Sequence, residues 1–206
     1  MKAKRIFDLL LACGALVILA PLLTITALVI KFDSSGPVIF AQRRVGCKGK
    51  LFCMYKFRTM RVGTPEVATD QLADAQRHIT RSGAFLRKYS IDELPQLLNI
   101  IKGDMSLVGP RPALPSQKEL VCQRSERGVD VLRPGLTGWA QVNGRDEILL
   151  AEKVKLDNEY KVRQSFSFDL YIIWLTVYSV VHGTGVKKMK TAGKVKGMDV
   201  STKGGG

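Results

Sequence analysis

Two adjacent carboxylates, Asp92 and Glu93, stand in a stretch of sequence whose backbone is tightly constrained. A proline follows at position 95, a short apolar run leads to Gly103, and the tripeptide Pro110-Arg111-Pro112 comes soon after. A carboxylate can attack phosphorus to give an aspartyl phosphate. Such chemistry needs a divalent ion and fixed cations around the phosphoryl oxygens. The pair therefore suggests a phosphoryl-transfer site.

The alternative role for this pair is structural. Ser90 and Glu93 have the spacing of a capping box, in which acidic residues stabilise the first turn of a helix. Pro95 fits that arrangement poorly, because it would lie past the helix positions whose N–H groups have no partner. A helix that begins at Pro95 and ends near Gly103 fits better. The carboxylates would then precede a helix N-terminus, where a phosphate or a bridging metal is stabilised. Both roles stay open on these residues alone.

Several cations could accompany the carboxylates. Arg87 belongs to a basic helical turn predicted over residues 84–89. Arg111 lies between two prolines that restrict its backbone, which suits preorganised binding of a phosphoryl oxygen.

Residues 37–45 and 50–60 are predicted to form two strands of a β-hairpin, joined at residues 46–49. The two-residue repeat of a strand puts Lys56 and Arg58 on one face. Such a face is either a solvated edge or a second phosphate-binding element.

A third polar cluster lies in residues 136–145. If this segment is extended, Trp139, Gln141, Asn143 and Arg145 point the same way and offer an aromatic ring, two amides and a guanidinium to a nucleotide. The alternative is a tight turn at Asn143-Gly144 with incidental polar neighbours.

The composition suits one compact domain with a polyanionic partner. The chain has 206 residues and a formal net charge of +14, which favours nucleic acid, an anionic membrane or phosphorylated substrates. Residues 61–79 are predicted to be a mobile loop, 147–164 a helix, and Pro134-Gly, Thr137-Gly and Asn143-Gly turns. Short strands among several helices indicate an α+β fold rather than a βαβ sheet. The four cysteines indicate neither a zinc site nor a disulfide framework.

The N-terminal segment predicts membrane association. Residues 7–30 are almost wholly apolar, with Asp8 the only charge, and are long enough to cross a bilayer. A secretory signal is disfavoured, because no clear cleavage site precedes Lys31. Basic residues flank both ends, which favours both on the cytoplasmic side, and Pro21 would break the helix. Spanning and re-entry into one leaflet are both consistent with this pattern.

Residues 166–181 form a second apolar stretch, too short to span a bilayer comfortably. Its residues Tyr171, Trp174 and Tyr178 suit the headgroup region, while an ordinary core helix explains the stretch equally well.

Taken together, these segments resemble the bacterial sugar transferase family, the small monotopic phosphoglycosyl transferases. The likeness runs in order from about residue 4 to 180. It is carried by Lys4-Arg-Ile-Phe-Asp8, Gly36-Pro-Val-Ile-Phe-Ala-Gln-Arg-Arg-Val-Gly46, Tyr55-Lys-Phe-Arg-Thr-Met60, the segment from Leu86 to Gln96, Lys102-Gly-Asp-Met-Ser-Leu-Val-Gly-Pro-Arg-Pro112, and the segment from Arg133 to Arg145. One departure is Ala20-Pro21, where some relatives have Ser-Pro.

The resemblance implies transfer of a sugar-1-phosphate from a UDP-sugar to undecaprenyl phosphate, the first step of assembling a polysaccharide or glycan. Asp92 would be the nucleophile that releases UMP, and Glu93, with Asp92, would hold Mg²⁺. Arg111 and Lys56 match basic positions near the phosphates, and Arg145 is a candidate on the nucleotide side. The N-terminal helix would be re-entrant, placing the catalytic domain on the cytoplasmic face of the bacterial inner membrane.

The expected organisation is a re-entrant membrane helix over residues 1–32, a catalytic domain over 33–185, and a flexible basic tail over 186–206. The expected partners are the UDP-sugar, undecaprenyl phosphate and an anionic bilayer. A nucleic-acid partner is disfavoured because no recognised motif appears. The alternatives are a non-enzymatic basic membrane-surface scaffold and an aspartyl-phosphate phosphohydrolase with water as its acceptor.

Overall fold

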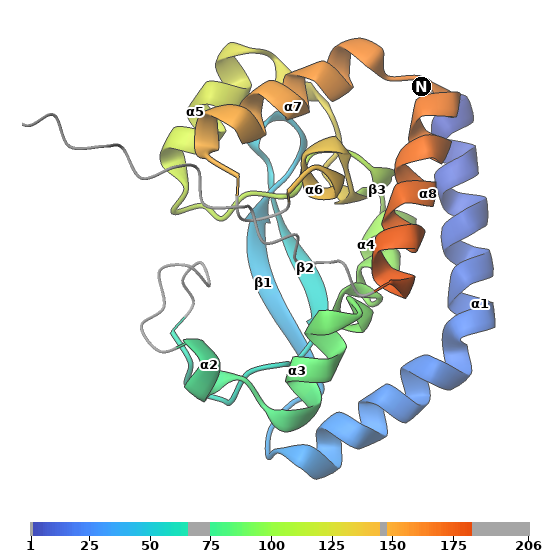
Figure 1. Ribbon diagram of the computed structural model, residues 1–206, viewed down its shortest axis with the longest axis vertical. Coiled ribbons are helices and arrows are strands. Elements are labelled where there is room, and N and C mark those ends of the chain that lie inside the picture. Colours follow the sequence, from blue (N-terminus) through green and yellow to red (C-terminus); the bar gives the residue numbers. More distant parts are fainter. Residues whose placement is uncertain (1, 66–74, 145–147, 183–206) are drawn as a thin grey trace, which may run out of the picture.

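The computed structural model describes residues 2–65, 75–144 and 148–182 (Figure 1). Arg145, the predicted basic tail over 186–206 and residues 66–74 of the predicted 61–79 loop therefore lie outside the described residues. The elements in chain order are α1 (Lys2–Asp33), β1 (Ile39–Val45), η1 (Cys47–Gly49), β2 (Leu51–Phe57), α2 (Ala75–His78), α3 (Arg81–Lys88), η3 (Ile91–Glu93), α4 (Gln96–Lys102), β3 (Ser106–Val108), α5 (Lys118–Glu126), η4 (Val129–Val131), β4 (Gly135–Thr137), α6 (Trp139–Val142), α7 (Leu150–Arg163) and α8 (Phe166–Val181).

Helix α1 is the long apolar element of the chain. It is long and apolar enough to cross a membrane, and its outer side chains such as Val17 and Ile18 are exposed. The helix runs through Pro21 without the predicted interruption, and it bends along its length (Figure 1). A proline removes one backbone hydrogen bond and kinks a helix, whereas the bonds on either side can persist.

The predicted hairpin is confirmed, with shorter strands. Strands β1 and β2 pair antiparallel from Ile39 opposite Phe57 to Val45 opposite Leu51. The connection turns through Lys48 and Gly49, which both have positive φ. In the described part of the segment predicted as a mobile loop, Ile79 bridges to Met60 at the end of the predicted strand, and residues 75–78 form the short helix α2.

The turns predicted at Pro134-Gly and Thr137-Gly are wrong, because Gly135 and Thr137 belong to a strand that the sequence did not reveal. Residues 135–137 form strand β4, which pairs parallel to β3. Three-residue strands are too short to show a hydrophobic period. A side chain at Gly135 would meet the backbone nitrogen of Gly109 at 2.1 Å, so glycine is required where the two backbones approach. The described part of the chain therefore contains two small sheets among helices, in keeping with the predicted α+β class.

Helix α4 packs at the centre of the domain. Its residues Leu97 and Ile100 contact Ala12 of α1 and Met54 of β2 in one buried cluster. Asn99 is fully buried, donating to the carbonyl of Cys53 at 2.7 Å and accepting from the Tyr55 amide at 3.0 Å. These contacts fix α4 against both α1 and the hairpin.

Helix α8 lies beside one half of α1 (Figure 1). Its residues Phe168 and Ile172 are buried in a cluster with Tyr160 and Val108. Its other side is apolar and exposed, with Trp174 59% exposed and stacked 5.9 Å from Tyr178. The helix therefore has a core face and an aromatic face toward the outside.

A buried polar network joins α1 to the domain; we call it the anchor cluster, comprising Lys4, Asp8, Ser106, Tyr160 and Asp169. Lys4 contacts Asp169 at 2.6 Å and Asp8 at 3.6 Å. Each aspartate also accepts a hydrogen bond from a hydroxyl group. Ser106 donates to Asp8 and Tyr160 donates to Asp169, both at 2.7 Å. The lone charge in the apolar segment thus binds α1 to β3 and, through Lys4, to α8.

Candidate active site

Asp92 and Glu93 lie in the short turn η3 between α3 and α4. The predicted helix start is confirmed, because α4 begins at Gln96 with Pro95 at its N-cap and ends at Gly103 in the left-handed conformation. Ser90 has a positive φ, and its side chain makes no capping bond to the turn. The capping-box interpretation is therefore wrong for this pair.

Glu93 collects two cations from distant parts of the chain. Its Oε1 accepts from Lys56 Nζ at 2.8 Å and from Arg111 Nη2 at 2.9 Å. Burial alone would raise the pKa of Glu93, but Arg111 and Lys56 outweigh it and hold the pKa well below its usual range. Burial lowers the pKa of Lys56, although the charge of Glu93 opposes that shift. We call this set of charges the catalytic cluster; its members are Lys56, Asp92, Glu93 and Arg111.

Asp92 has a different electrostatic environment from its neighbour. It is only 8% exposed. Burial, followed by the negative charge of Glu93, raises its pKa to about 6, against the opposing effects of Lys56, Arg87 and Arg111. The carboxylate is therefore mostly ionised at neutral pH yet weakly stabilised in that form, as expected of a reactive group.

Arg87 joins this environment from the last turn of α3. Its positive charge lowers the pKa of Asp92, as do those of Lys56 and Arg111. Three of the predicted phosphate-binding cations thus act on the carboxylate pair.

Arg58 does not join them, although the predicted strand placed it on the same face as Lys56. Strand β2 ends at Phe57, and the Arg58 guanidinium donates to the carbonyls of Ser34 and Ser35 and to the Ser34 hydroxyl. Arg58 is 5% exposed and fastens the end of α1 to the hairpin. Its contacts therefore point to a structural role, which corrects the phosphate-binding prediction.

Of the two alternatives for residues 136–145, the extended segment is wrong, and the turn at Asn143-Gly144 is confirmed. Residues 139–142 form helix α6, followed by a turn at Asn143-Gly144. Gln141 donates to the carbonyl of Leu136 and Asn143 to that of Trp139. Trp139 packs against Phe168 of α8 at 5.1 Å, so the three side chains do not share one face for a nucleotide.

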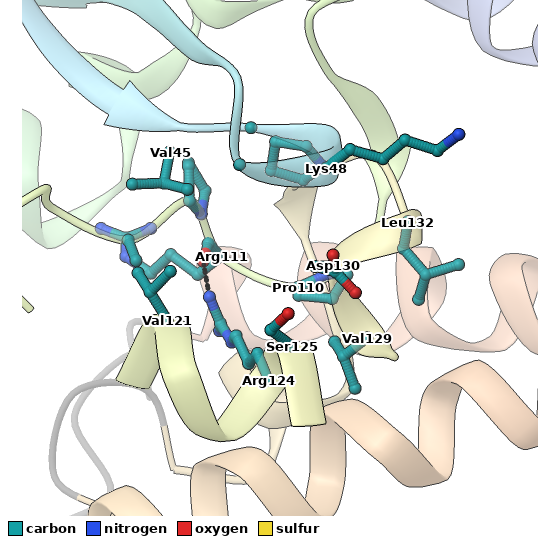
Figure 2. A pocket seen from close by; sticks show the side chains of 15 residues that line it. Val45, Lys48, Pro110, Arg111, Val121, Arg124, Ser125, Val129, Asp130 and Leu132 are labelled. Carbon is teal, nitrogen blue, oxygen red and sulfur yellow. Dashed lines mark hydrogen bonds between the residues drawn. The ribbon is translucent and has the colours of Figure 1, made fainter. Parts of the chain in front are cut away.

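A pocket of about 160 Å³ is lined in part by the Pro110-Arg111-Pro112 loop (Figure 2). Neither Asp92 nor Glu93 is among its lining residues. Its walls come from the hairpin turn, the loop, α5 and η4; the residues are Val45, Gly46, Lys48, Gly49, Pro110, Arg111, Pro112, Ala113, Val121, Arg124, Ser125, Val129, Asp130, Leu132 and Pro134.

The carboxylate pair also fits the donor set of a magnesium site completed by substrate. Among the described residues, no group of three or more His, Cys, Asp or Glu side chains is placed to hold a metal. Mg²⁺ is typically bound through one or two carboxylates together with substrate phosphates and water. Asp92 and Glu93 supply two such carboxylates, and the low pKa of Glu93 keeps one of them ionised.

Comparison with known proteins shows the family of this chain. A sequence model of the bacterial sugar transferase family matches residues 1–183. The chain belongs to this family. It is 43% identical to the uncharacterized sugar transferase EpsL of Bacillus subtilis (strain 168) over 188 residues, covering 91% of this chain and 92% of EpsL.

Relatives in the same family have more specific names. The chain is 41% identical over 182 residues to the UDP-glucose:undecaprenyl-phosphate glucose-1-phosphate transferase of Escherichia coli (strain K12), covering 85% of this chain but 39% of that longer protein. It is 40% identical to the exopolysaccharide production protein ExoY of Rhizobium meliloti (strain 1021), covering 89% and 87% of the two chains.

Sequence reasoning missed two sets of buried polar residues. The first set is Lys4 and Asp169 of the anchor cluster. The sequence carried one signal for it, because Asp8 is a lone aspartate in an apolar helix and requires a partner. Arg124 and Asp157 form a buried ion pair at 2.6 Å between α5 and α7. No local pattern marked that pair, because its members lie 33 positions apart.

Proposed function

We propose that this sugar transferase moves a sugar-1-phosphate from a UDP-sugar to undecaprenyl phosphate. The observation that carries the proposal is the division of roles between adjacent carboxylates. Both cations bind one oxygen of Glu93, while Asp92 remains ionisable with a pKa of about 6. The names of the relatives from Escherichia coli and from Komagataeibacter xylinus, an undecaprenyl-phosphate glucose phosphotransferase, support the substrate classes.

The chemistry proceeds in two displacements. A carboxylate oxygen of Asp92 attacks the β-phosphorus of the donor, and the bond from that phosphorus to the bridging oxygen breaks to release UMP. The phosphate oxygen of the polyprenyl acceptor then attacks the phosphosugar–aspartate. This step gives the polyprenyl-diphosphate sugar and restores the Asp92 carboxylate.

The surrounding residues bind and orient the donor. Lys56, Arg87 and Arg111 provide positive charge for the phosphoryl oxygens, which carry most of the charge in such reactions. Asp92 and Glu93 would hold Mg²⁺, which supplies further neutralisation of the diphosphate when bound. Lys56 and Arg111 also fix the carboxylate of Glu93, so the pair is oriented before substrate arrives.

We infer that the protein is monotopic, with α1 entering one leaflet and returning. The bend in α1 (Figure 1) and the basic residues at both ends of the helix support this placement. The exposed aromatic face of α8 suits the headgroup region of the same membrane. The catalytic cluster would then face the cytoplasm, where UDP-sugars occur.

The test is UMP release by the purified full chain in nanodiscs with Mg²⁺ and a panel of UDP-sugars, with and without undecaprenyl phosphate. We expect lipid-dependent UMP release from one donor. UMP or sugar phosphate released equally without the lipid would instead identify a phosphohydrolase. No turnover with any donor, together with binding to anionic vesicles, would favour the scaffold.

A further inference from the structure

The loop that carries Arg111 is held through its carbonyl groups. The prolines at 110 and 112 have no N–H to donate. The backbone of this loop is therefore held mainly by hydrogen bonds that its carbonyl groups accept. Four consecutive carbonyls each accept one bond from another element: Pro110 from the Gly135 amide at 2.9 Å, Arg111 from Arg124 Nη1 at 2.8 Å, Pro112 from Arg44 Nη1 at 3.2 Å and Ala113 from the Val45 amide at 2.9 Å.

Arg124 is the buried side chain in this set, and it has a second partner. Its Nε and Nη2 donate to Oδ2 of Asp157 at 2.9 and 2.6 Å. The side chains of Arg124 and Asp157 are 9% and 2% exposed. Figure 2 shows Arg124 reaching from α5 toward the loop, with its bond to the carbonyl of Arg111 drawn as a dashed line. All three guanidinium nitrogens are therefore engaged.

The pocket explains why this bond matters for the loop. Pro110, Arg111 and Pro112 line the pocket, as does Arg124 itself. Where a void borders a segment, packing against neighbouring atoms cannot fix it. On this side the hydrogen bond from Arg124 holds the Arg111 carbonyl itself, between the bonded carbonyls of Pro110 and Pro112.

We propose that Arg124, oriented by Asp157, is a positioning residue for Arg111. A chain of contacts runs from Asp157 on α7 through Arg124 on α5 to the carbonyl of Arg111, and from the Arg111 side chain to Glu93 at 2.9 Å. Fixing that carbonyl fixes the point from which the guanidinium reaches Glu93 and the donor's phosphoryl oxygens. The inference rests on the proposed function of Arg111 as a phosphate-binding cation.

The residue type supports this role. A planar guanidinium donates in several fixed directions, so it can bind a carboxylate along one edge and a carbonyl from its other nitrogen. A lysine ammonium at the same place keeps the charge beside Asp157. It cannot donate both to that carboxylate and to the carbonyl of Arg111 in the directions that the guanidinium provides. Buried ion pairs are weak evidence for stability alone, so a positioning role accounts for the arrangement better than a stabilising one.

A double-mutant cycle tests the proposal in the full chain, with Arg124→Lys and Arg111→Gln measured singly and together. We expect kcat/KM for the UDP-sugar to fall about tenfold in Arg124→Lys and about a hundredfold in Arg111→Gln. The double variant should match Arg111→Gln within about twofold, since Arg124 acts through Arg111. Additive losses, or a wild-type rate in Arg124→Lys, would overturn the proposal.

Two further measurements separate positioning from folding. Amide hydrogen exchange at Gly135 and Val45, whose N–H groups donate to the carbonyls of Pro110 and Ala113, should become about tenfold faster in Arg124→Lys, with α7 unchanged; unchanged exchange at both amides would count against the proposal whatever the activity. Glu119→Gln alters a charge on the same helix, at a residue that accepts from Gln123, and serves as the matched control. A wild-type chain without lipid-dependent transfer would refute the proposed function, while the exchange experiment would still test the loop.

Discussion

The anchor cluster and the catalytic cluster are both partly buried sets of charges, but they neutralise their carboxylates differently. In the anchor cluster one lysine contacts two aspartates, and each aspartate also accepts from a hydroxyl at 2.7 Å. In the catalytic cluster two cations share one oxygen of Glu93. Asp92 beside it keeps a pKa raised to about 6.

This difference in how the carboxylates are neutralised is the one expected between a structural site and a reactive site. Buried charges that have paired and hydrogen-bonded partners hold elements together. A buried carboxylate whose ionised form stays weakly stabilised can give up its charge to a covalent bond more readily. The following experiments perturb the two clusters in turn.

The largest effect is expected for Asp92→Asn. The amide cannot attack phosphorus, so kcat should fall at least about a thousandfold. The melting temperature should stay the same or rise slightly, because burial disfavours the ionised form of Asp92. Lipid-dependent UMP release and a thermal melt measure both quantities. Activity within tenfold of wild type would exclude Asp92 as the nucleophile.

Lys4→Met should act on stability instead of chemistry. It leaves Asp8 and Asp169, both 3% exposed, without their shared cation. Removing one partner of a buried charge cluster typically costs about 3 kcal/mol or more of unfolding free energy. Denaturation in detergent measures the loss, with Lys31→Met, at the exposed far end of the same helix, as the control. Equal stability of the two variants would contradict the anchoring role.

The pH dependence should report on Asp92. Its pKa of about 6 predicts that log kcat/KM falls with decreasing pH below about 6, as the nucleophile is protonated. Glu93→Gln removes a neighbouring negative charge and should move this limb to lower pH, whereas Arg111→Gln should move it higher. Movement of both variants in one direction would contradict this electrostatic scheme.

The same group should affect stability with the opposite trend to an ordinary paired carboxylate. Its pKa in the folded state lies above the ordinary aspartate pKa of 3.8. Its stabilising contribution is therefore full below about 3.8 and is lost as the pH rises to about 6. The unfolding free energy of the wild type, measured from pH 4 to 7, should contain a decrease with rising pH that is absent in Asp92→Asn. The same dependence on pH in both proteins would contradict the raised pKa.

The smallest effect is expected at an exposed ion pair, which gives a baseline for both clusters. Glu159 and Arg163 lie one turn apart on α7, with side chains 36% and 52% exposed. Glu159→Gln should change the unfolding free energy by about 0.5 kcal/mol or less and leave transfer unchanged. A loss comparable to that of Lys4→Met would show that burial does not distinguish these charges.

The sequence by itself determined the hairpin, the limits of α4 and the family. Alternating strands around a glycine turn predicted the hairpin, and Pro95 and Gly103 marked the ends of α4. These features depend on the conformations open to neighbouring residues, which the sequence displays directly. The adjacent Asp92 and Glu93 likewise marked the candidate site before any contact was known.

Only the tertiary structure decided which charges meet. Lys56 reaches Glu93 while Arg58, two positions later, fastens the end of α1. The bond from Arg124 to the loop and the parallel β3–β4 pair also join segments far apart in the chain. Such pairings follow from how helices and strands pack, and many alternative partners have the same residue types. Spacing along the chain therefore identified the groups, and the fold selected their partners.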